Sequence, residues 1–269
     1  MTGARVAAHR GGALLWPENS LLAFRNALAL GAELLELDVH LAADDGVPVI
    51  HDPTLDRTTD GAGPVRARAA AELRGLRLRG PDGVVTGERL PMLEEVLPLV
   101  ARAAAGLLLE VKGPEPGVAV RYGRRDGHVV AEPGARYEGL EERVLAALAS
   151  AGMQDRCTVI AFNPAVLARV RVLDPGQRTS LLVAGPHVEL VGARPEDTVA
   201  WAVAAGAADL GVQHTLATEA LMTAARAAGL TVGVWTANDE PTLRRMADLG
   251  VDVITSDRPD LALRVLGRA

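Results

Sequence analysis

The 269-residue sequence has little sulfur and few aromatic side chains. Cys157 is the only cysteine, so no disulfide can form within the chain, and a reducing cytoplasm is the expected compartment. Aromatic residues make up 3% of the chain, which is too few for a surface on which nucleic-acid bases stack. The formal net charge is −6 and basic residues form no run, which argues against a nucleic-acid partner, because binding to phosphates needs clustered positive charge.

Long hydrophobic runs are also missing. No stretch approaches the roughly 18 apolar residues that cross a bilayer, and the first ten residues lack the apolar stretch of a secretory signal. We therefore expect no stable insertion into a membrane. Apolar residues still make up 49% of the chain, and one domain over residues 1–269 is expected because α/β barrels often reach this size.

Lysine is nearly absent. Of the 28 basic residues, all but Lys112 are arginine. A position that keeps lysine can be one that needs a compact ammonium group instead of a planar guanidinium group. Chance is the alternative explanation for a single lysine.

Short apolar runs alternate with helical patterns along almost the whole chain. The predicted strands are Val6–His9, Leu34–Leu41, Leu107–Lys112, Thr158–Phe162, Thr179–Val183, Ala208–Val212, Thr231–Thr236 and Val253–Ser256. The predicted helices are Ser20–Leu30, Leu93–Ala105, Leu140–Ala151, Pro164–Leu173, Pro195–Ala205, Thr218–Ala228, Pro241–Leu249 and Pro259–Leu266. Eight strand–helix units predict an α/β fold, a (β/α)₈ TIM barrel. An open, doubly wound sheet is disfavoured, because no G-x-G-x-x-G turn follows the first strand.

Two connections are longer than is usual in a compact domain. Residues 42–91 separate the second strand from its helix and contain a strand-like run, Val47–His51. We predict a small insertion within the domain over residues 53–91. Residues 113–139 are rich in Gly, Pro and Arg, and they form either a functional loop or a hairpin without chemistry. Both connections are expected at the C-terminal mouth of the barrel.

Charged residues alternate with aliphatic residues in two predicted strands. Glu36 and Asp38 share one face of the second strand, since strand side chains point to opposite faces in turn. Glu110 and Lys112 share a face of the third strand. Three carboxylates in a barrel lumen would cost several kcal/mol each to desolvate, unless a divalent cation compensates them. All-oxygen ligation favours Mg²⁺ or Ca²⁺ over zinc; the alternative is that these groups are surface charges at strand ends.

Two histidines end strand-like runs near these charges. His9 is followed by Arg10-Gly11-Gly12, and His51 is followed by Asp52. Two histidines beside a metal can act as an acid–base pair, because histidine titrates near neutral pH. Arg10 offers a planar fork of donors to a phosphate. His40 shares the acidic face of its strand, but we expect it beyond the strand end and in solvent.

Several short motifs are spread along nearly the whole chain. They are His9-Arg10-Gly11-Gly12, Pro17-Glu18-Asn19-Ser20, Glu36-Leu37-Asp38-Val39, the run from Gly46 to Thr59, Leu90-Pro91-Met92-Leu93-Glu94-Glu95, Glu110-Val111-Lys112-Gly113, Val234-Trp235-Thr236-Ala237-Asn238 and Thr255-Ser256-Asp257-Arg258-Pro259. In this order, the set resembles the motifs of the glycerophosphodiester phosphodiesterases. A single H-R-G would be a weak signal, but the ordered set is specific. The turn at Asp44-Asp45-Gly46 is one residue longer than the family's turn, and the 113–139 loop is distinctive.

The resemblance implies a TIM barrel with an insertion after its second strand, one divalent cation, and roles for particular residues. The metal ligands would be Glu36, Asp38 and Glu110. The catalytic residues would be His9 and His51. The phosphate would be bound by Arg10 and Lys112. The pocket for the glycerol and the leaving group would be lined by Phe162 and Trp235, for which packing is the alternative role. Glu18 would support Arg10 or the first loop, and Asp257 would be either a helix N-cap or a site residue.

The resemblance also implies an activity, the hydrolysis of a glycerophosphodiester to sn-glycerol 3-phosphate and an alcohol. The substrate's own 2-hydroxyl would attack and form a cyclic phosphate, with His9 favoured as the first base. Two alternatives are removal of the head group of a lysophospholipid and a barrel that binds phosphate esters without turnover. A glycoside hydrolase is disfavoured, because the fourth and seventh strands end in Phe162-Asn163 and Trp235-Thr236 without carboxylates.

Overall fold

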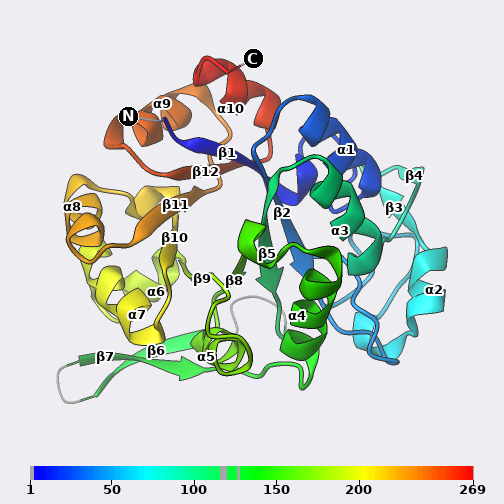
Figure 1. The fold of residues 1–269 in the computed structure, drawn as a ribbon, viewed down its shortest axis with the longest axis horizontal. Helices are drawn as coiled ribbons and strands as arrows, with labels where there is room; N and C mark the ends of the chain where they lie inside the picture. Colours follow the sequence, from blue (N-terminus) through cyan, green and yellow to red (C-terminus); the bar gives the residue numbers. More distant parts are fainter. Residues whose placement is uncertain (1–2, 116–119, 126–127, 269) are drawn as a thin grey trace.

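The computed structural model describes residues 3–115, 120–125 and 128–268. Eight parallel strands form a closed barrel in the order β1-β12-β11-β10-β9-β8-β5-β2 (Figure 1). They are β1 (Arg5–Ala8), β2 (Leu34–Val39), β5 (Gly106–Val111), β8 (Cys157–Ala161), β9 (Thr179–Val183), β10 (Asp209–Gln213), β11 (Thr231–Trp235) and β12 (Val253–Ser256). Each corresponds to one of the strands predicted from the sequence, so the predicted TIM barrel is confirmed.

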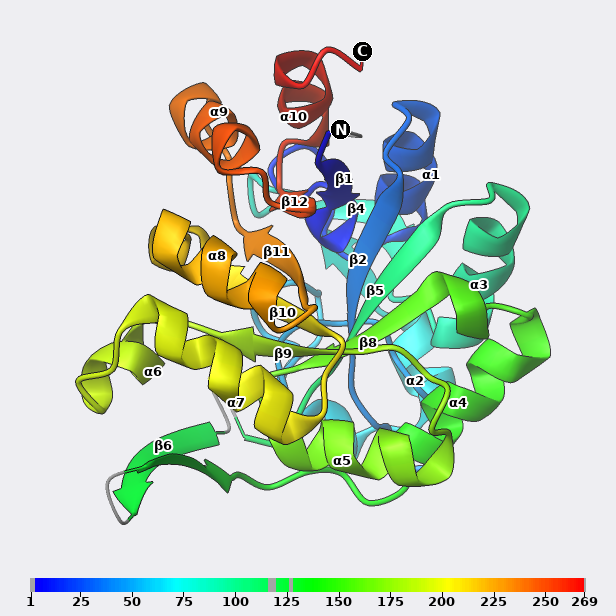
Figure 2. The same ribbon diagram turned by 60° about the vertical axis from the view of Figure 1, so that its left-hand side comes forward.

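Helices follow the barrel strands and cover the outside of the barrel (Figures 1 and 2). They are α1 (Leu21–Ala29), α3 (Leu93–Arg102), α4 (Leu140–Ala151), α5 (Pro164–Leu173), α6 (Gly185–Leu190), α7 (Thr198–Ala205), α8 (Glu219–Ala227), α9 (Glu240–Leu249) and α10 (Pro259–Val265). Side-chain caps mark several starts; the Ser20 hydroxyl accepts a hydrogen bond from the Ala23 amide, for example. The short α6 was not predicted, because six residues carry too little periodicity. No helix in the described ranges is long and apolar enough to cross a membrane.

Successive side chains of β2 point in turn to the hydrophobic core and to the inside of the barrel. Leu35 and Val39 belong to the main hydrophobic core, and Glu36 and Asp38 take the opposite face. All six residues of β2 are buried. The strand pairs in parallel with β5, where Asp38 lies opposite Glu110. The acidic residues of two neighbouring strands therefore lie together inside the barrel.

The connection between β2 and α3 forms a small structure beside the barrel. It contains a 3₁₀ turn (Val65–Ala67), α2 (Ala70–Gly75) and an antiparallel pair, β3 (Arg77–Arg79) and β4 (Val85–Arg89). Most of its buried apolar residues form a hydrophobic cluster separate from the main core: Ala42, Ile50, Leu55, Val65, Ala70, Leu73, Leu78, Leu90 and Met92. The strand predicted at 47–51 is reduced to two isolated bridges, Val39 with Val49 and Pro48 with Met92.

The long connection after β5 forms a hairpin in the part that the structure describes. Its strands are β6 (Val120–Arg125) and β7 (His128–Pro133). The hairpin extends to one side of the barrel, next to α5 and α7 (Figures 1 and 2). Tyr122 of β6 stacks on Trp201 of α7, with ring centroids 4.3 Å apart. The hairpin is therefore anchored to the outer helices by aromatic packing.

Candidate active site

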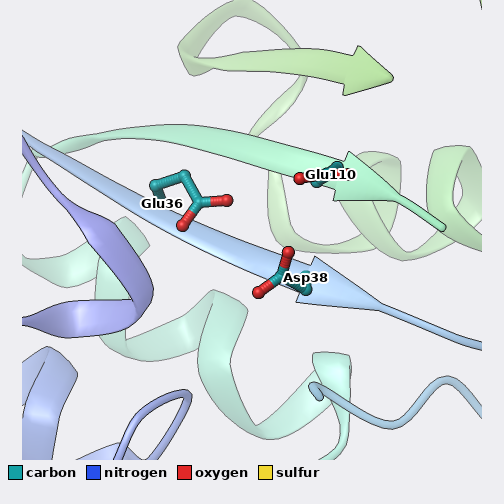
Figure 3. A group of neighbouring side chains, drawn as sticks. All are labelled: Glu36, Asp38 and Glu110. Carbon is teal, nitrogen blue, oxygen red and sulfur yellow. The ribbon is translucent and has the colours of Figure 1, made fainter. Parts of the chain in front are cut away.

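Three carboxylates converge at the carboxyl ends of β2 and β5. Glu36 and Asp38 project from β2, and Glu110 projects from the neighbouring strand (Figure 3). One carboxylate oxygen of each residue lies within 4.8 Å of the other two, and all three residues are buried. The convergence expected from the strand pattern is thus present. The predicted alternative, that these groups are surface charges, is wrong.

The three carboxylates do not share the same electrostatic surroundings. Burial raises the pKa of Glu36 to about 8, and the charge of Asp38 adds to the rise. Burial also opposes ionisation of Asp38, but the positive charges of Lys112, His51 and Arg10 outweigh it and hold the pKa of Asp38 well below its usual value. The protein therefore compensates the charge of Glu36 less well than that of Asp38.

This donor set fits a hard divalent cation. Glu36, Asp38 and Glu110 supply only oxygen atoms, which Mg²⁺ and Ca²⁺ prefer. The Lys112 ammonium lies 3.0 Å from Asp38 Oδ1 and 2.6 Å from Glu110 Oε1. The Lys112 ammonium and the Arg10 guanidinium group, which lies 3.4 Å from Asp38 Oδ2, are two positive charges beside three buried carboxylates, so negative charge remains uncompensated. The residues present are thus suited to hold a cation with two positive charges.

His9 follows β1 directly and is held by an aspartate from the other end of the chain. His9 Nδ1 lies 2.6 Å from Asp257 Oδ1, and its Nε2 lies 3.9 Å from Glu36 Oε2. The Asn238 side chain donates to Asp257 Oδ2 at 2.7 Å. Asp257 caps no helix, because the residue at the start of α10 is Arg258 and no side chain caps it. Asp257 is therefore part of the site, a question that the sequence left open, and Asn238 was missed.

His51 has an aspartate partner of its own. Its Nδ1 lies 2.7 Å from Asp52 Oδ1. When Nδ1 donates to a carboxylate, Nε2 of a neutral imidazole is free to accept a proton. Both predicted catalytic histidines, His9 and His51, are therefore held in the same way at Nδ1. The aspartate beside His51 is its neighbour in sequence, whereas Asp257 lies 248 residues from His9.

His40 is buried, so the prediction that its side chain lies in solvent is wrong. The residue is 1% exposed, since the chain that leads to His51 runs back across the end of β2, where the Ile50 amide donates to the Asp38 carbonyl. His40 Nε2 lies 3.0 Å from the His51 carbonyl oxygen and Nδ1 lies 3.0 Å from the Tyr137 hydroxyl. Burial lowers the pKa of His40 to about 4. A neutral His40 therefore supports the backbone of a site residue.

Arg10 lies against the acidic group. Its backbone amide donates to Glu36 Oε2 at 3.0 Å, and its Nε lies 3.4 Å from Asp38 Oδ2. Its Nη1 donates to Glu18 Oε1 at 3.0 Å, so Glu18 supports Arg10 as expected. The buried Asn19 side chain donates to Asp38 Oδ2 at 2.9 Å. Arg10 has a φ of 51°, a left-handed conformation that the first loop imposes.

Phe162 and Trp235 stand at the ends of β8 and β11. Their rings meet edge to face, with centroids 5.6 Å apart and planes at 88°. Both line a cavity of about 200 Å³ inside the barrel. The same cavity is lined by His9, Arg10, Glu36, His51, Glu110 and Lys112. Phe162 and Trp235 therefore pack against each other and also line the pocket, so they combine the two roles that the sequence left open.

Comparison with known proteins gives a consistent result. Residues 9–261 match the model of the glycerophosphoryl diester phosphodiesterase family. The chain is 30% identical over 275 residues to a glycerophosphodiester phosphodiesterase of Bacillus altitudinis, with 97% of each chain covered. It is 29% identical over 264 residues to that of Caldanaerobacter subterraneus, again with 97% of each covered.

A solved structure matches over the same length. A phosphodiesterase of Oleispira antarctica in complex with the product sn-glycerol-3-phosphate superposes with a TM-score of 0.77 and 25% identity, covering 98% of this chain and 97% of that one. The family match extends from His9 to Leu261 and so includes every residue of the site described above. The chain belongs to the glycerophosphoryl diester phosphodiesterase family.

Proposed function

We propose that the protein hydrolyses glycerophosphodiesters to sn-glycerol 3-phosphate and an alcohol, with one divalent cation, Mg²⁺ or Ca²⁺. The observation that carries the proposal is that two aspartate-bonded histidines line one cavity together with carboxylates and two cationic side chains. The names of the relatives support the substrate class. The complex of the Oleispira protein supports the product.

Glu36, Asp38 and Glu110 would hold the cation, which supplies Lewis-acid stabilisation of a phosphoryl oxygen and a template for the glycerol. Arg10 and Lys112 would neutralise the charge that develops on the other phosphoryl oxygens. Both lie within 3.4 Å of Asp38. The phosphate would therefore lie directly beside the acidic group.

His9 and His51 would move the protons. In the first step His9 accepts the proton of the substrate's 2-hydroxyl, whose oxygen bonds to phosphorus. The bond from phosphorus to the leaving alcohol breaks, and His51 donates a proton to that oxygen. In the second step His51 takes a proton from water, which opens the cyclic phosphate, and His9 returns its proton to the 2-oxygen. Asp257 and Asp52 would keep the Nδ1 proton in place, so that Nε2 is the atom that reacts.

Phe162 and Trp235 would form the apolar wall against which the glycerol and the leaving group pack. Their perpendicular rings line the cavity next to His9 and Lys112. We infer further that the enzyme acts in the cytoplasm, because the single cysteine, Cys157, is buried and forms no disulfide.

The test is a coupled assay for sn-glycerol 3-phosphate over a panel of water-soluble diesters, with and without a chelator. We expect turnover that chelation abolishes and that Mg²⁺ or Ca²⁺ restores. The variant His51→Ala should have lost turnover, and full activity of this variant on glycerophosphocholine would contradict the proposal. A preference for micellar lysolipid over soluble diesters would favour the lysolipid alternative. Tight binding without cleavage at saturating metal would favour a non-catalytic protein.

A further inference from the structure

Arg57, in the segment that follows His51, bonds two carboxylates from different parts of the chain. Its Nε and Nη2 donate to Asp52 Oδ2 and Oδ1 at 2.7 and 3.1 Å. Its Nη1 and Nη2 donate to Glu18 Oε2 and Oε1 at 2.7 and 2.9 Å. Glu18 is 39 residues away, in the loop between β1 and α1. Two forked contacts use the planar geometry of a guanidinium group, which a lysine side chain does not have.

Each of these carboxylates also holds a residue of the site. Asp52 Oδ1 lies 2.7 Å from His51 Nδ1, and Glu18 Oε1 accepts from Arg10 Nη1 at 3.0 Å. Arg57 is therefore the central member of an unbroken chain of contacts that runs from the His51 ring to the Arg10 guanidinium group. It does not line the cavity itself.

The positive charge of Arg57 compensates both carboxylates in this series of contacts, Glu18 and Asp52. Burial disfavours the ionised form of Glu18, but the hydrogen bonds from Arg57 and the charge of Arg10 outweigh it and lower the pKa of Glu18. The hydrogen bond from His51 and those from Arg57 hold the pKa of Asp52 below its usual range. Without Arg57, Asp52 would lose its only cationic partner besides His51 among the described residues. Its carboxylate would then be free to turn away from the imidazole.

The contact between Arg57 and Glu18 joins two parts of the fold that pack separately. The segment after His51 has its own hydrophobic cluster, which contains Leu55 on the same turn as Arg57 but none of the β1 loop. The contact between Arg57 and Glu18 joins this segment to the loop that carries His9 and Arg10. One side chain thus connects the two parts of the fold that supply the two histidines.

We propose that Arg57 is a positioning residue, which fixes the His51 ring and the Arg10 guanidinium group relative to each other through Asp52 and Glu18. The inference rests on the proposed function, because it gives these two groups a shared substrate. A displacement of about 1 Å of a reacting group can cost about 100-fold in rate. Arg57 therefore acts on turnover without touching the substrate.

The test compares Arg57→Gln and Arg57→Lys with Arg77→Gln. Arg77 is a matched control: it lies in the same segment and donates to Asp60 Oδ2 at 2.9 Å, but it contacts no residue of the site. We expect Arg57→Gln to lower kcat about 100-fold and Arg57→Lys about 10-fold, with both variants folded by circular dichroism. Arg77→Gln should stay within about 2-fold of the parent protein, as expected for an exposed ion pair.

A double-mutant cycle shows whether Arg57 acts through Asp52. In the Asp52→Asn background, Arg57→Gln should cost only a few-fold more, because the link to His51 is already broken. Losses that multiply fully would show that Arg57 does not act on the His51 ring by this route. A kcat for Arg57→Gln equal to that of Arg77→Gln would overturn the inference and leave the proposed function intact.

A spectroscopic measurement tests the role of Arg57 independently of the proposed diesterase activity. The ¹⁵N chemical shifts of the His51 ring report which nitrogen carries the proton, and they require no turnover. We expect them to change in Arg57→Gln and to stay unchanged in Arg77→Gln. If the parent protein cleaves no diester, the proposed function fails, and these shifts still decide whether Arg57 orients the histidine. Unchanged shifts in Arg57→Gln would refute the link.

Discussion

His40 Nε2 lies 3.0 Å from the carbonyl oxygen of His51, so one histidine holds the backbone of another. His40 directly follows β2, the strand that supplies Glu36 and Asp38. Its second ring nitrogen lies 3.0 Å from the hydroxyl of Tyr137, in the connection that precedes α4. The position of His51 therefore depends on the same strand that carries the acidic group.

Replacement of His40 should affect both stability and turnover. In His40→Leu the His51 carbonyl loses its donor, and a buried polar group without a partner costs about 1–3 kcal/mol. We expect kcat to fall about 10-fold, because His51 shifts relative to the substrate. Tyr137→Phe removes only the bond on the far side of His40, so it should lower the free energy of unfolding by about 1 kcal/mol and leave kcat almost unchanged. Urea unfolding and steady-state kinetics check both effects, and equal losses of kcat would contradict this role.

Asp257→Asn should lower kcat by about 100- to 10,000-fold, because an amide can donate to His9 Nδ1 and so impose the wrong tautomer. The fold should be unaffected, since Asn238 still has a polar partner at this position. Steady-state kinetics and thermal unfolding measure the two effects separately.

Asp260→Asn is the matched control for this variant. Asp260 is three residues further along and accepts two hydrogen bonds from Arg258. We expect kcat within about 2-fold of the parent protein, because this contact is partly exposed. Equal kcat values for Asp257→Asn and Asp260→Asn would show that Asp257 does not orient His9.

Glu36→Gln should make the metal-free protein more stable and should remove its stabilisation by metal ions. Burial and the charge of Asp38 raise the pKa of Glu36, so its ionised form destabilises the metal-free protein. Above pH 8 the variant should therefore unfold at a higher temperature than the metal-free parent; a gain of about 1 kcal/mol corresponds to roughly 2–4 °C. Mg²⁺ or Ca²⁺ should stabilise the parent in a concentration-dependent way and should no longer stabilise the variant.

Glu240→Gln serves as the reference for this measurement. Glu240 pairs with Arg244 on the exposed surface of α9. We expect this variant to keep the full stabilisation by metal ions. A metal response in Glu36→Gln as large as in Glu240→Gln would exclude Glu36 as a ligand.

Stability should fall in mild acid because His187 is buried in its neutral form. Burial lowers the pKa of His187 to about 4, from an ordinary value of 6.5. The unfolded chain therefore binds a proton below pH 6.5 that the folded chain accepts only near pH 4, so the free energy of unfolding declines as the pH drops between these values. The loss from this residue is at most about 3 kcal/mol.

Urea unfolding at pH 7 and pH 5 measures this loss, with His187→Gln as the variant that lacks the titrating group. The difference in the free energy of unfolding between the two pH values should be smaller in the variant than in the parent protein. His187 contacts Tyr122 and Phe162, which are not charged at either pH. An identical pH dependence in both proteins would contradict a neutral, buried His187.

Features with a local or periodic signal could be read from the sequence. The alternation of Glu36 and Asp38 with aliphatic residues, and of Glu110 with its neighbours, predicts which strand face is acidic, because side-chain direction in a strand depends only on position. The eight strand–helix units predict the barrel, because strands that alternate with helices form a parallel sheet and eight such units close into a barrel. The pairing of Asp38 with Glu110 follows once the strands are neighbours in the barrel.

Other features have no local signal. The solvated position expected for His40 was wrong, because its burial depends on how the chain returns across β2 and on Tyr137, which lies 97 residues away. The sequence did not decide between a functional loop and a hairpin after β5, because the hairpin packs on Trp201, which belongs to a helix distant in the sequence.

The sequence by itself determined the barrel and the chemical character of its mouth, because both follow from periodic patterns and from residue types. The tertiary structure alone decided which groups orient the histidines. Asp257 reaches His9 over 248 residues, and Arg57 reaches Glu18 over 39. Such hydrogen bonds require particular distances and angles between atoms, and these are set only when the barrel closes and brings its first and last strands side by side.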